Sequence, residues 1–133
     1  MTGLVIATHA RLGEELLNAA EMIIGPTASA RAVSICMGDS VESIRERIET
    51  AISEVGGDGE GVVIMTDMFG GTPSNISLSF LETERIEVIT GVNLPMVLKF
   101  FNSQEDLSLG DLSGMIKAYG EQSISLPSEF LKK

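Results

Sequence analysis

Residues 62–75 read VVIMTDMFGGTPSN, and we predict that the rest of the chain is arranged around this stretch. Its first three residues form an apolar run without polar alternation, which is typical of a strand covered by helices on both faces. Asp67 follows where the run stops, a glycine pair turns the chain, and Thr72 and Pro73 read as an N-cap and a first helical residue. The stretch therefore predicts a strand, a turn and a helix start, beside the crevice where open α/β sheets bind ligands.

The predicted helix start is a candidate anion site. A helix N-terminus offers unpaired N–H groups and a partial positive charge to a phosphate. The candidate phosphate-binding groups are the backbone at Gly70 and Gly71 and the hydroxyls of Thr72 and Ser74. Asp67 would place a carboxylate next to them.

Strands and helices alternate along the whole chain. Continuous or alternating apolar runs predict strands, and apolar residues at helical spacing predict helices. The predicted strands are residues 3–8, 32–37, 62–66 and 86–90. The first two predicted helices are residues 11–24 and a helix that is capped by Asp39 or Ser40 and reaches residue 55. Three further helices are predicted, one beginning at residue 73, one opened by residues 93–95 and one over residues 107–119. This alternation predicts one α/β domain over residues 1–133, doubly wound, with four parallel strands in the order 2-1-3-4 and helices on both faces.

The C-terminal residues 123–126, Ser-Ile-Ser-Leu, alternate like a half-buried strand. They are too far from the fourth strand to be its hairpin partner. We therefore expect a C-terminal strand that adds antiparallel to an edge of the sheet, in its own subunit or in a neighbouring one.

Composition and charge argue against nucleic-acid-binding, disulfide-bonded and membrane-spanning proteins. Nineteen acidic against nine basic residues leave a formal charge of −10, which repels nucleic acid and anionic lipid and attracts a basic protein. Cys36 is the only cysteine, so neither an intramolecular disulfide nor a cysteine metal cluster can form, which favours a reducing compartment. No apolar run approaches the roughly 20 residues that span a bilayer. We expect a cytoplasmic protein that does not itself span a membrane and that uses no metal ion or cofactor.

His9, the only histidine, follows the first predicted strand. In the order 2-1-3-4 the first and third strands are neighbours, so His9 and Asp67 should lie side by side at their carboxyl ends. A carboxylate that accepts the Nδ1 proton leaves Nε2 free as a nucleophile. The pair suits capture of a phosphoryl group, because an imidazole nitrogen attacks phosphorus and the nearby anion stabilises the cation that forms.

Simpler interpretations of these residues stay open. A histidine at a strand end can merely hydrogen-bond a loop, and Asp67 can merely cap a turn. Cys36 has no basic neighbour in the sequence and reads as a small buried hydrophobe. Met68 and Phe69 fall on the loop after the third strand and are candidates for an exposed docking surface.

Four motifs together resemble the IIA component (EIIA) of the mannose-type bacterial phosphoenolpyruvate:sugar phosphotransferase system. They are Thr8-His9, AEM at residues 20–22, Asp67 with FGGTPSN at residues 69–75, and GVNLPM at residues 91–96. The resemblance covers nearly the whole chain. It implies a histidine phosphocarrier: His9 accepts a phosphoryl group on Nε2 from the carrier protein HPr, Asp67 orients the ring, and an EIIB component that serves a sugar permease receives the group.

The resemblance also implies a cytoplasmic homodimer in which a C-terminal strand crosses to the partner subunit, which would give residues 123–126 a role. Two departures stand out. Many members have glycine directly after the histidine, where this chain has Ala10, so we expect a different local turn. The chain also ends without the linker and IIB domain that some relatives carry, so the phosphoryl group is expected to leave to a separate chain.

Three alternative functions share some of these features. A regulatory module phosphorylated at His9, without sugar transport, fits the same residues. A response-regulator receiver would carry its phosphoryl group on Asp67, but it needs an acidic pair after the first strand to hold magnesium, where Thr8 and His9 stand. A dinucleotide-binding module is disfavoured because residues 9–13, HARLG, contain no G-x-G-x-x-G pattern.

Overall fold

The computed structural model describes residues 2–56, 59–103 and 107–131. Within these ranges, the strands form one parallel sheet in the order β2-β1-β3-β4, which confirms the predicted topology. The strands are β1 (Gly3–His9), β2 (Ala30–Ile35), β3 (Val62–Thr66) and β4 (Ile86–Thr90). The helices are α1 (Leu12–Ile24), α2 (Val41–Val55), α3 (Thr72–Leu78), α4 (Leu94–Asn102), α5 (Leu109–Gln122) and α6 (Pro127–Leu131).

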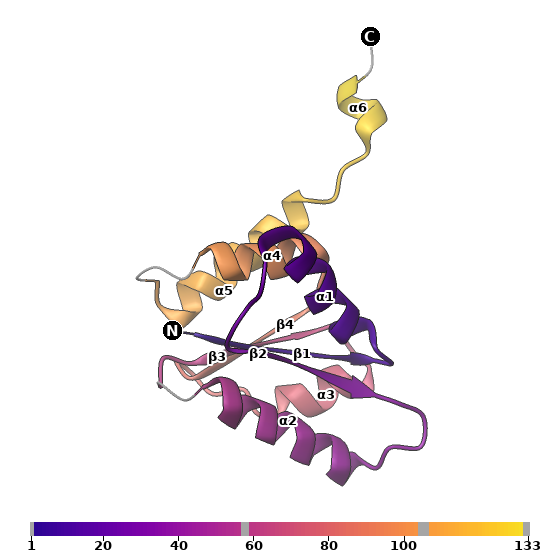
Figure 1. Ribbon diagram of the computed structural model, residues 1–133, viewed down its shortest axis with the longest axis vertical. Helices are drawn as coiled ribbons and strands as arrows, with labels where there is room; N and C mark the ends of the chain where they lie inside the picture. The colour runs from indigo at the N-terminus through magenta and orange to yellow at the C-terminus, as the bar shows by residue number, and fades with distance from the viewer. Residues whose placement is uncertain (1, 57–58, 104–106, 132–133) are drawn as a thin grey trace.

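Helices cover both faces of the sheet, as the doubly wound prediction requires. Helices α1, α4 and α5 lie on one face, and α2 and α3 lie on the other (Figure 1). Each face has its own apolar cluster, one including Leu4 and Phe100 and the other including Val5 and Ile48. The central strands β1 and β3 are therefore buried on both sides, which explains why their sequences are continuous apolar runs.

The register of the sheet positions the candidate site. Ala7 of β1 pairs with Thr66 of β3 at the carboxyl ends of the two central strands. His9 and Asp67 therefore stand at the same rim of the sheet. The adjacency predicted from strand order is confirmed.

Several predicted boundaries shift when the chain folds. β2 ends at Ile35, so Cys36 lies in the following loop and is exposed, and the prediction that it is a buried hydrophobe is wrong. Gly71, not Thr72, is the N-cap of α3, because the helix begins one residue early and Thr72 is already helical. Of the two residues considered as caps for α2, Ser40 accepts the hydrogen bond, from the N–H of Ser43.

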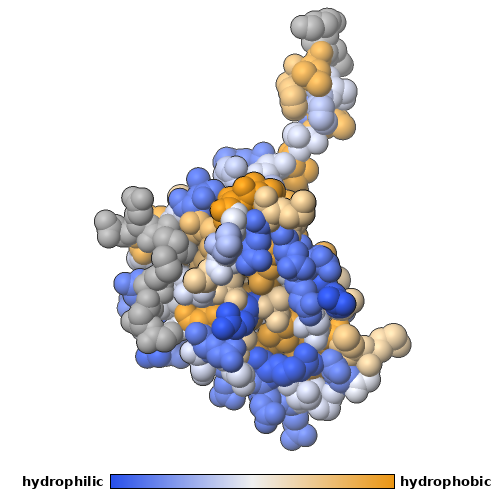
Figure 2. All heavy atoms as spheres, viewed as in Figure 1, coloured by the Kyte–Doolittle hydropathy of each residue, from blue (hydrophilic) through white to orange (hydrophobic). Residues whose placement is uncertain are grey.

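The predicted C-terminal strand does not form within the chain's own subunit. Helix α5 continues to Gln122, and residues 124–126 then run, without pairing to the sheet, to α6, which projects away from the body of the molecule (Figure 1). Ile124 lines the same groove as Val88 and Ile89 of β4, but residues 124–126 form no strand and do not pair with the sheet. We call the segment after α5, residues 123–131, the C-terminal arm. Hydrophobic side chains along it, including those of Ile124 and Leu126, are exposed to solvent (Figure 2).

Candidate phosphohistidine site

His9 and Asp67 form the centre of the site. A single carboxylate oxygen, Oδ2 of Asp67, lies 2.8 Å from Nδ1 of His9 and 3.1 Å from the backbone nitrogen of the same residue. A carboxylate can only accept, so this contact assigns the ring proton to Nδ1. Nε2 makes no hydrogen bond within the described residues. The His9 side chain is 50% exposed, whereas that of Asp67 is 13% exposed, so a less exposed orienting group holds a ring that solvent and partners can reach.

The backbone after His9 adopts an unusual conformation. Ala10 has φ +51°, in the left-handed region that favours glycine, and its N–H donates to the carbonyl of Ile35 at 2.8 Å. The turn therefore holds alanine in a left-handed conformation that glycine would adopt freely, and a difference from the turn of relatives with glycine stays a prediction.

Thr8 links the strand to the helix that follows. Its side chain is fully buried, and Oγ1 accepts a hydrogen bond of 2.8 Å from the N–H of Gly13 in the first turn of α1. Arg11 occupies the N-cap position but makes no side-chain capping bond. Thr8 therefore caps α1 from the strand, a role that sequence spacing did not indicate because the residue lies before the expected cap position.

The glycine pair has two separate reasons to be glycine. Gly70 has φ +96°, which side-chain-bearing residues rarely adopt. At Gly71, a Cβ atom would lie 2.8 Å from Cε1 and 3.3 Å from Nε2 of His9. The imidazole therefore packs directly against the Gly71 backbone, which the sequence alone did not reveal.

The two hydroxyl residues proposed for phosphate binding have different environments. Thr72 is exposed and lines the cleft beside His9. Ser74 is completely buried, and its Oγ has no hydrogen-bond partner among the described residues. Phosphate binding by Gly70, Gly71, Thr72 and Ser74 stays a prediction, and Ser74 is less accessible to a phosphoryl group than Thr72.

A cleft opens on one side of the imidazole. Its volume is about 490 Å³, and its walls come from the end of β1, the loop between β2 and α2, the first half of α2 and the start of α3. The lining residues are His9, Ala10, Ile35, Cys36, Met37, Gly38, Asp39, Ile44 and Thr72. Met68 and Phe69 of the β3–α3 loop are both exposed, which confirms the exposure expected of them.

Two acidic residues on neighbouring elements are held as carboxylates. The backbone N–H of Cys36 donates to Asp39 and lowers its pKa, and the Arg47 guanidinium acts in the same direction. The hydroxyl of Ser34 lowers the pKa of Glu14, and the positive charge of Arg11 adds to this effect. Within the described ranges no group of three or more potential metal ligands lies together. None of the described helices is long and apolar enough to cross a bilayer.

Comparison with known families agrees with the fold and the site described above. The family described as "PTS system fructose IIA component" (EIIA-man) matches residues 3–117 of the chain. The chain belongs to this mannose-type EIIA family. Membership makes it a component of the sugar phosphotransferase system and supports a phosphocarrier role in sugar transport.

Individual relatives support the same family assignment, and a solved structure shares the fold. The fructose-specific EIIA component of Bacillus subtilis (strain 168) is 33% identical over 134 residues, which cover 100% of this chain and 91% of that protein. The mannose-specific EIIAB component of Escherichia coli (strain K12) is 31% identical over 104 residues, and the match covers 77% of this chain but 32% of that protein. A crystal structure of an EIIA from Streptococcus agalactiae has the same fold, with a TM-score of 0.87 at 22% identity, covering 97% of this chain and 99% of that one.

Proposed function

We propose that Nε2 of His9 is the atom that accepts a phosphoryl group from HPr and passes it to an EIIB component. The observation that carries the proposal is the 2.8 Å contact between Nδ1 of His9 and Oδ2 of Asp67. This contact holds the proton on Nδ1 and leaves the lone pair of Nε2 free on an exposed ring edge. Family membership supports HPr and EIIB as the classes of partner in general.

The proposed transfer follows from this tautomer. The Nε2 lone pair attacks phosphorus, an N–P bond forms, and the bond from phosphorus to the donor breaks with its electron pair staying on the donor. The imidazole then carries a positive charge, which the adjacent carboxylate of Asp67 balances. Phosphoryl transfer depends mainly on positioning and charge neutralisation, and Asp67 contributes to both. In the transfer to EIIB, a nucleophile of EIIB attacks phosphorus, and the N–P bond breaks with its electron pair returning to Nε2.

The test is incorporation of labelled phosphate from phosphoenolpyruvate through the general carrier proteins and HPr. His9→Ala should lose all acid-labile label, because the chain has no second imidazole. Circular dichroism should be unchanged, since the ring is half exposed and packs in no core cluster. Label at the wild-type level on the His9→Ala protein would place the phosphoryl group elsewhere and contradict the proposal.

Delivery to EIIB needs its own experiment. The phosphorylated chain is isolated, mixed with a candidate EIIB and sampled over time. Rapid movement of the label to EIIB supports the carrier role. Retention of the label at every concentration of every EIIB tested would instead support the regulatory module that the sequence left open.

We also propose that two EIIA chains form a dimer by exchanging their C-terminal arms. Two observations support this proposal. Residues 123–126 alternate like a strand but have no strand partner in their own subunit, and β4 is an edge strand that no other strand covers among the described residues. A groove of about 540 Å³ lies along this edge, between β4 and α5. Glu82 already bridges Ile86 at the start of β4, so an added strand would pair with the part of the edge beyond Ile86 and would cover the exposed side chains of Ile124 and Leu126.

A further inference from the structure

The loop between β2 and α2, residues 36–40, stands opposite His9. It contributes Cys36, Met37, Gly38 and Asp39 to the cleft that the His9 ring also lines. Met37 is fully exposed. Because the loop and the His9 ring line the same cleft, a protein that reaches His9 from this side lies against the loop.

Asp39 folds this loop onto itself. Its Oδ2 accepts the N–H of Cys36 at 2.8 Å, and its own N–H donates to the Cys36 carbonyl at 3.2 Å. Gly38 between them has φ +89° and lets the chain reverse. The loop is therefore a closed turn whose geometry depends on one carboxylate.

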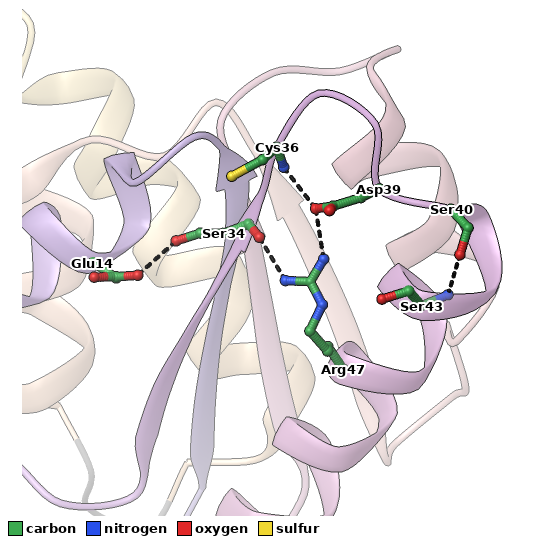
Figure 3. Close-up of polar contacts among 7 residues, drawn as sticks. All are labelled: Glu14, Ser34, Cys36, Asp39, Ser40, Ser43 and Arg47. Atoms are coloured by element: carbon green, nitrogen blue, oxygen red, sulfur yellow. Dashed lines mark hydrogen bonds and ion pairs between the residues drawn. The ribbon is translucent and has the colours of Figure 1, made fainter.

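Arg47, two turns into α2, ties this turn to the rest of the fold. One guanidinium nitrogen contacts Oδ2 of Asp39 at 2.8 Å, and another donates to the Ser34 carbonyl of β2 at 2.6 Å (Figure 3). A single planar guanidinium thus connects a helix, a strand end and the turn. Among the described residues no hydrogen bond or ion pair joins Arg47 or Asp39 to His9.

We propose that Arg47 and Asp39 are positioning residues that fix the β2–α2 turn as one wall of the surface on which phosphorylated HPr docks. The inference rests on the proposed function of His9 and extends it to residues outside the His9–Asp67 pair. Because the two residues act on the cleft wall and not on the imidazole, they set the affinity for the partner and leave the chemical step alone.

The chain contains a matched control for this proposal. Arg31 also joins β2 to α2: it pairs with Glu54 at 3.2 Å and donates to the backbone carbonyl of Ala30. It lies at the opposite end of β2, far from the loop that follows Ile35. Arg31→Gln and Arg47→Gln therefore change the net charge equally and each removes one ion pair and one hydrogen bond to a strand carbonyl.

The experiment measures phosphoryl uptake over a range of concentrations of phosphorylated HPr. Arg47→Gln should raise KM about tenfold, because the turn is then ordered in only a fraction of the molecules before HPr binds, with kcat within about twofold of wild type. Arg31→Gln should change neither constant. Arg47→Lys should restore only part of the affinity, because an ammonium group cannot reproduce the two-point contact. Combining Arg47→Gln with Asp39→Ala should cost little more than either change alone, because both remove the same clamp.

A second measurement does not depend on phosphoryl transfer. Hydrogen exchange of the Cys36 amide, which donates to Asp39, should accelerate about tenfold in Arg47→Gln and stay at the wild-type rate in Arg31→Gln. If the wild-type protein takes up label but Arg47→Gln and Arg31→Gln share the same KM, the docking role is overturned while the function of His9 stands. If the wild-type protein takes up no label, the function of His9 fails and the docking role fails with it, whatever the exchange rates show.

Discussion

At the scale of single residues, the site depends on one oxygen atom. Oδ2 of Asp67 accepts from both the backbone and the ring of His9, so the carboxylate sets the path of the chain and the tautomer together. Gly71 provides the flat surface against which the ring lies. Asp67 and the Gly71 backbone thus hold the exposed ring in place before any partner protein binds.

Replacing Asp67 tests this arrangement. Asp67→Ala should slow phosphoryl uptake about a hundredfold without abolishing it, since orientation and charge balance are lost but the nucleophile remains. Uptake is followed as the rate of acid-labile labelling at saturating donor. The label should still map to His9, and a rate equal to that of the wild type would show that the pair has no functional role.

Replacing Ala10 should increase stability, whereas most substitutions reduce it. Ala10→Gly should raise the free energy of unfolding by about 1 kcal/mol, because the left-handed strain of alanine exceeds the entropic cost of glycine. The control is Ala118→Gly on an exposed position of α5, which should lower it by about 1 kcal/mol. Urea denaturation measures both, and a loss of stability at position 10 would contradict the strain argument.

At the scale of secondary structure, strand ends and helix starts are joined by specific polar contacts. Thr8 at the end of β1 caps α1, and Arg47 of α2 holds the end of β2 and the turn beyond it. Both contacts lie at the rim of the sheet where His9 stands. The elements that carry the site are therefore fixed relative to one another by bonds separate from the two apolar clusters.

The capping role of Thr8 is open to a direct test. Thr8→Val should lower the free energy of unfolding by about 2 kcal/mol, because the buried N–H of Gly13 loses its acceptor. The matched control is Thr66→Val at the end of β3. Thr66 is equally buried, but its Oγ1 has no partner among the described residues, so this change should be nearly neutral. Equal losses in the two variants would rule out the cap.

At the scale of the whole molecule, the two edges of the sheet differ. On β2, two backbone carbonyls accept hydrogen bonds from arginine side chains. Arg31 donates to the carbonyl of Ala30, and Arg47 donates to the carbonyl of Ser34. β4 borders an open groove instead. Edge strands blocked by charged side chains resist strand addition, so β4 is the edge that we expect to receive the C-terminal arm of a second chain.

Placing a charge on the arm tests the dimer. Ile124→Asp should convert the dimer to a monomer, because it removes an apolar side chain from the arm and adds a carboxylate to a groove that Glu87 and Glu121 already line. Light scattering coupled to size exclusion gives the mass. Val41→Asp, an exposed apolar position on α2, should leave the dimer intact. A wild-type protein that is monomeric at micromolar concentration would refute the exchange of arms.

Much of this arrangement could be predicted from the sequence because it follows from local pattern. Apolar runs and helical spacing indicated the elements, and the rules for connecting parallel strands then placed His9 beside Asp67. The start of α4 at residues 93–95 and the exposure of Phe69 are of the same kind, because each depends on a few neighbouring residues.

The tertiary structure alone decided the features that depend on where distant segments meet. The exposure of Cys36, the clamp between Arg47 and Asp39, the packing of the imidazole on Gly71 and the projection of residues 124–126 from the body have no periodic signature. Periodicity reports which face of an element is buried, whereas a polar contact between elements depends on the exact end of each strand and the direction of each side chain. Those are set only when the sheet and its helices pack together.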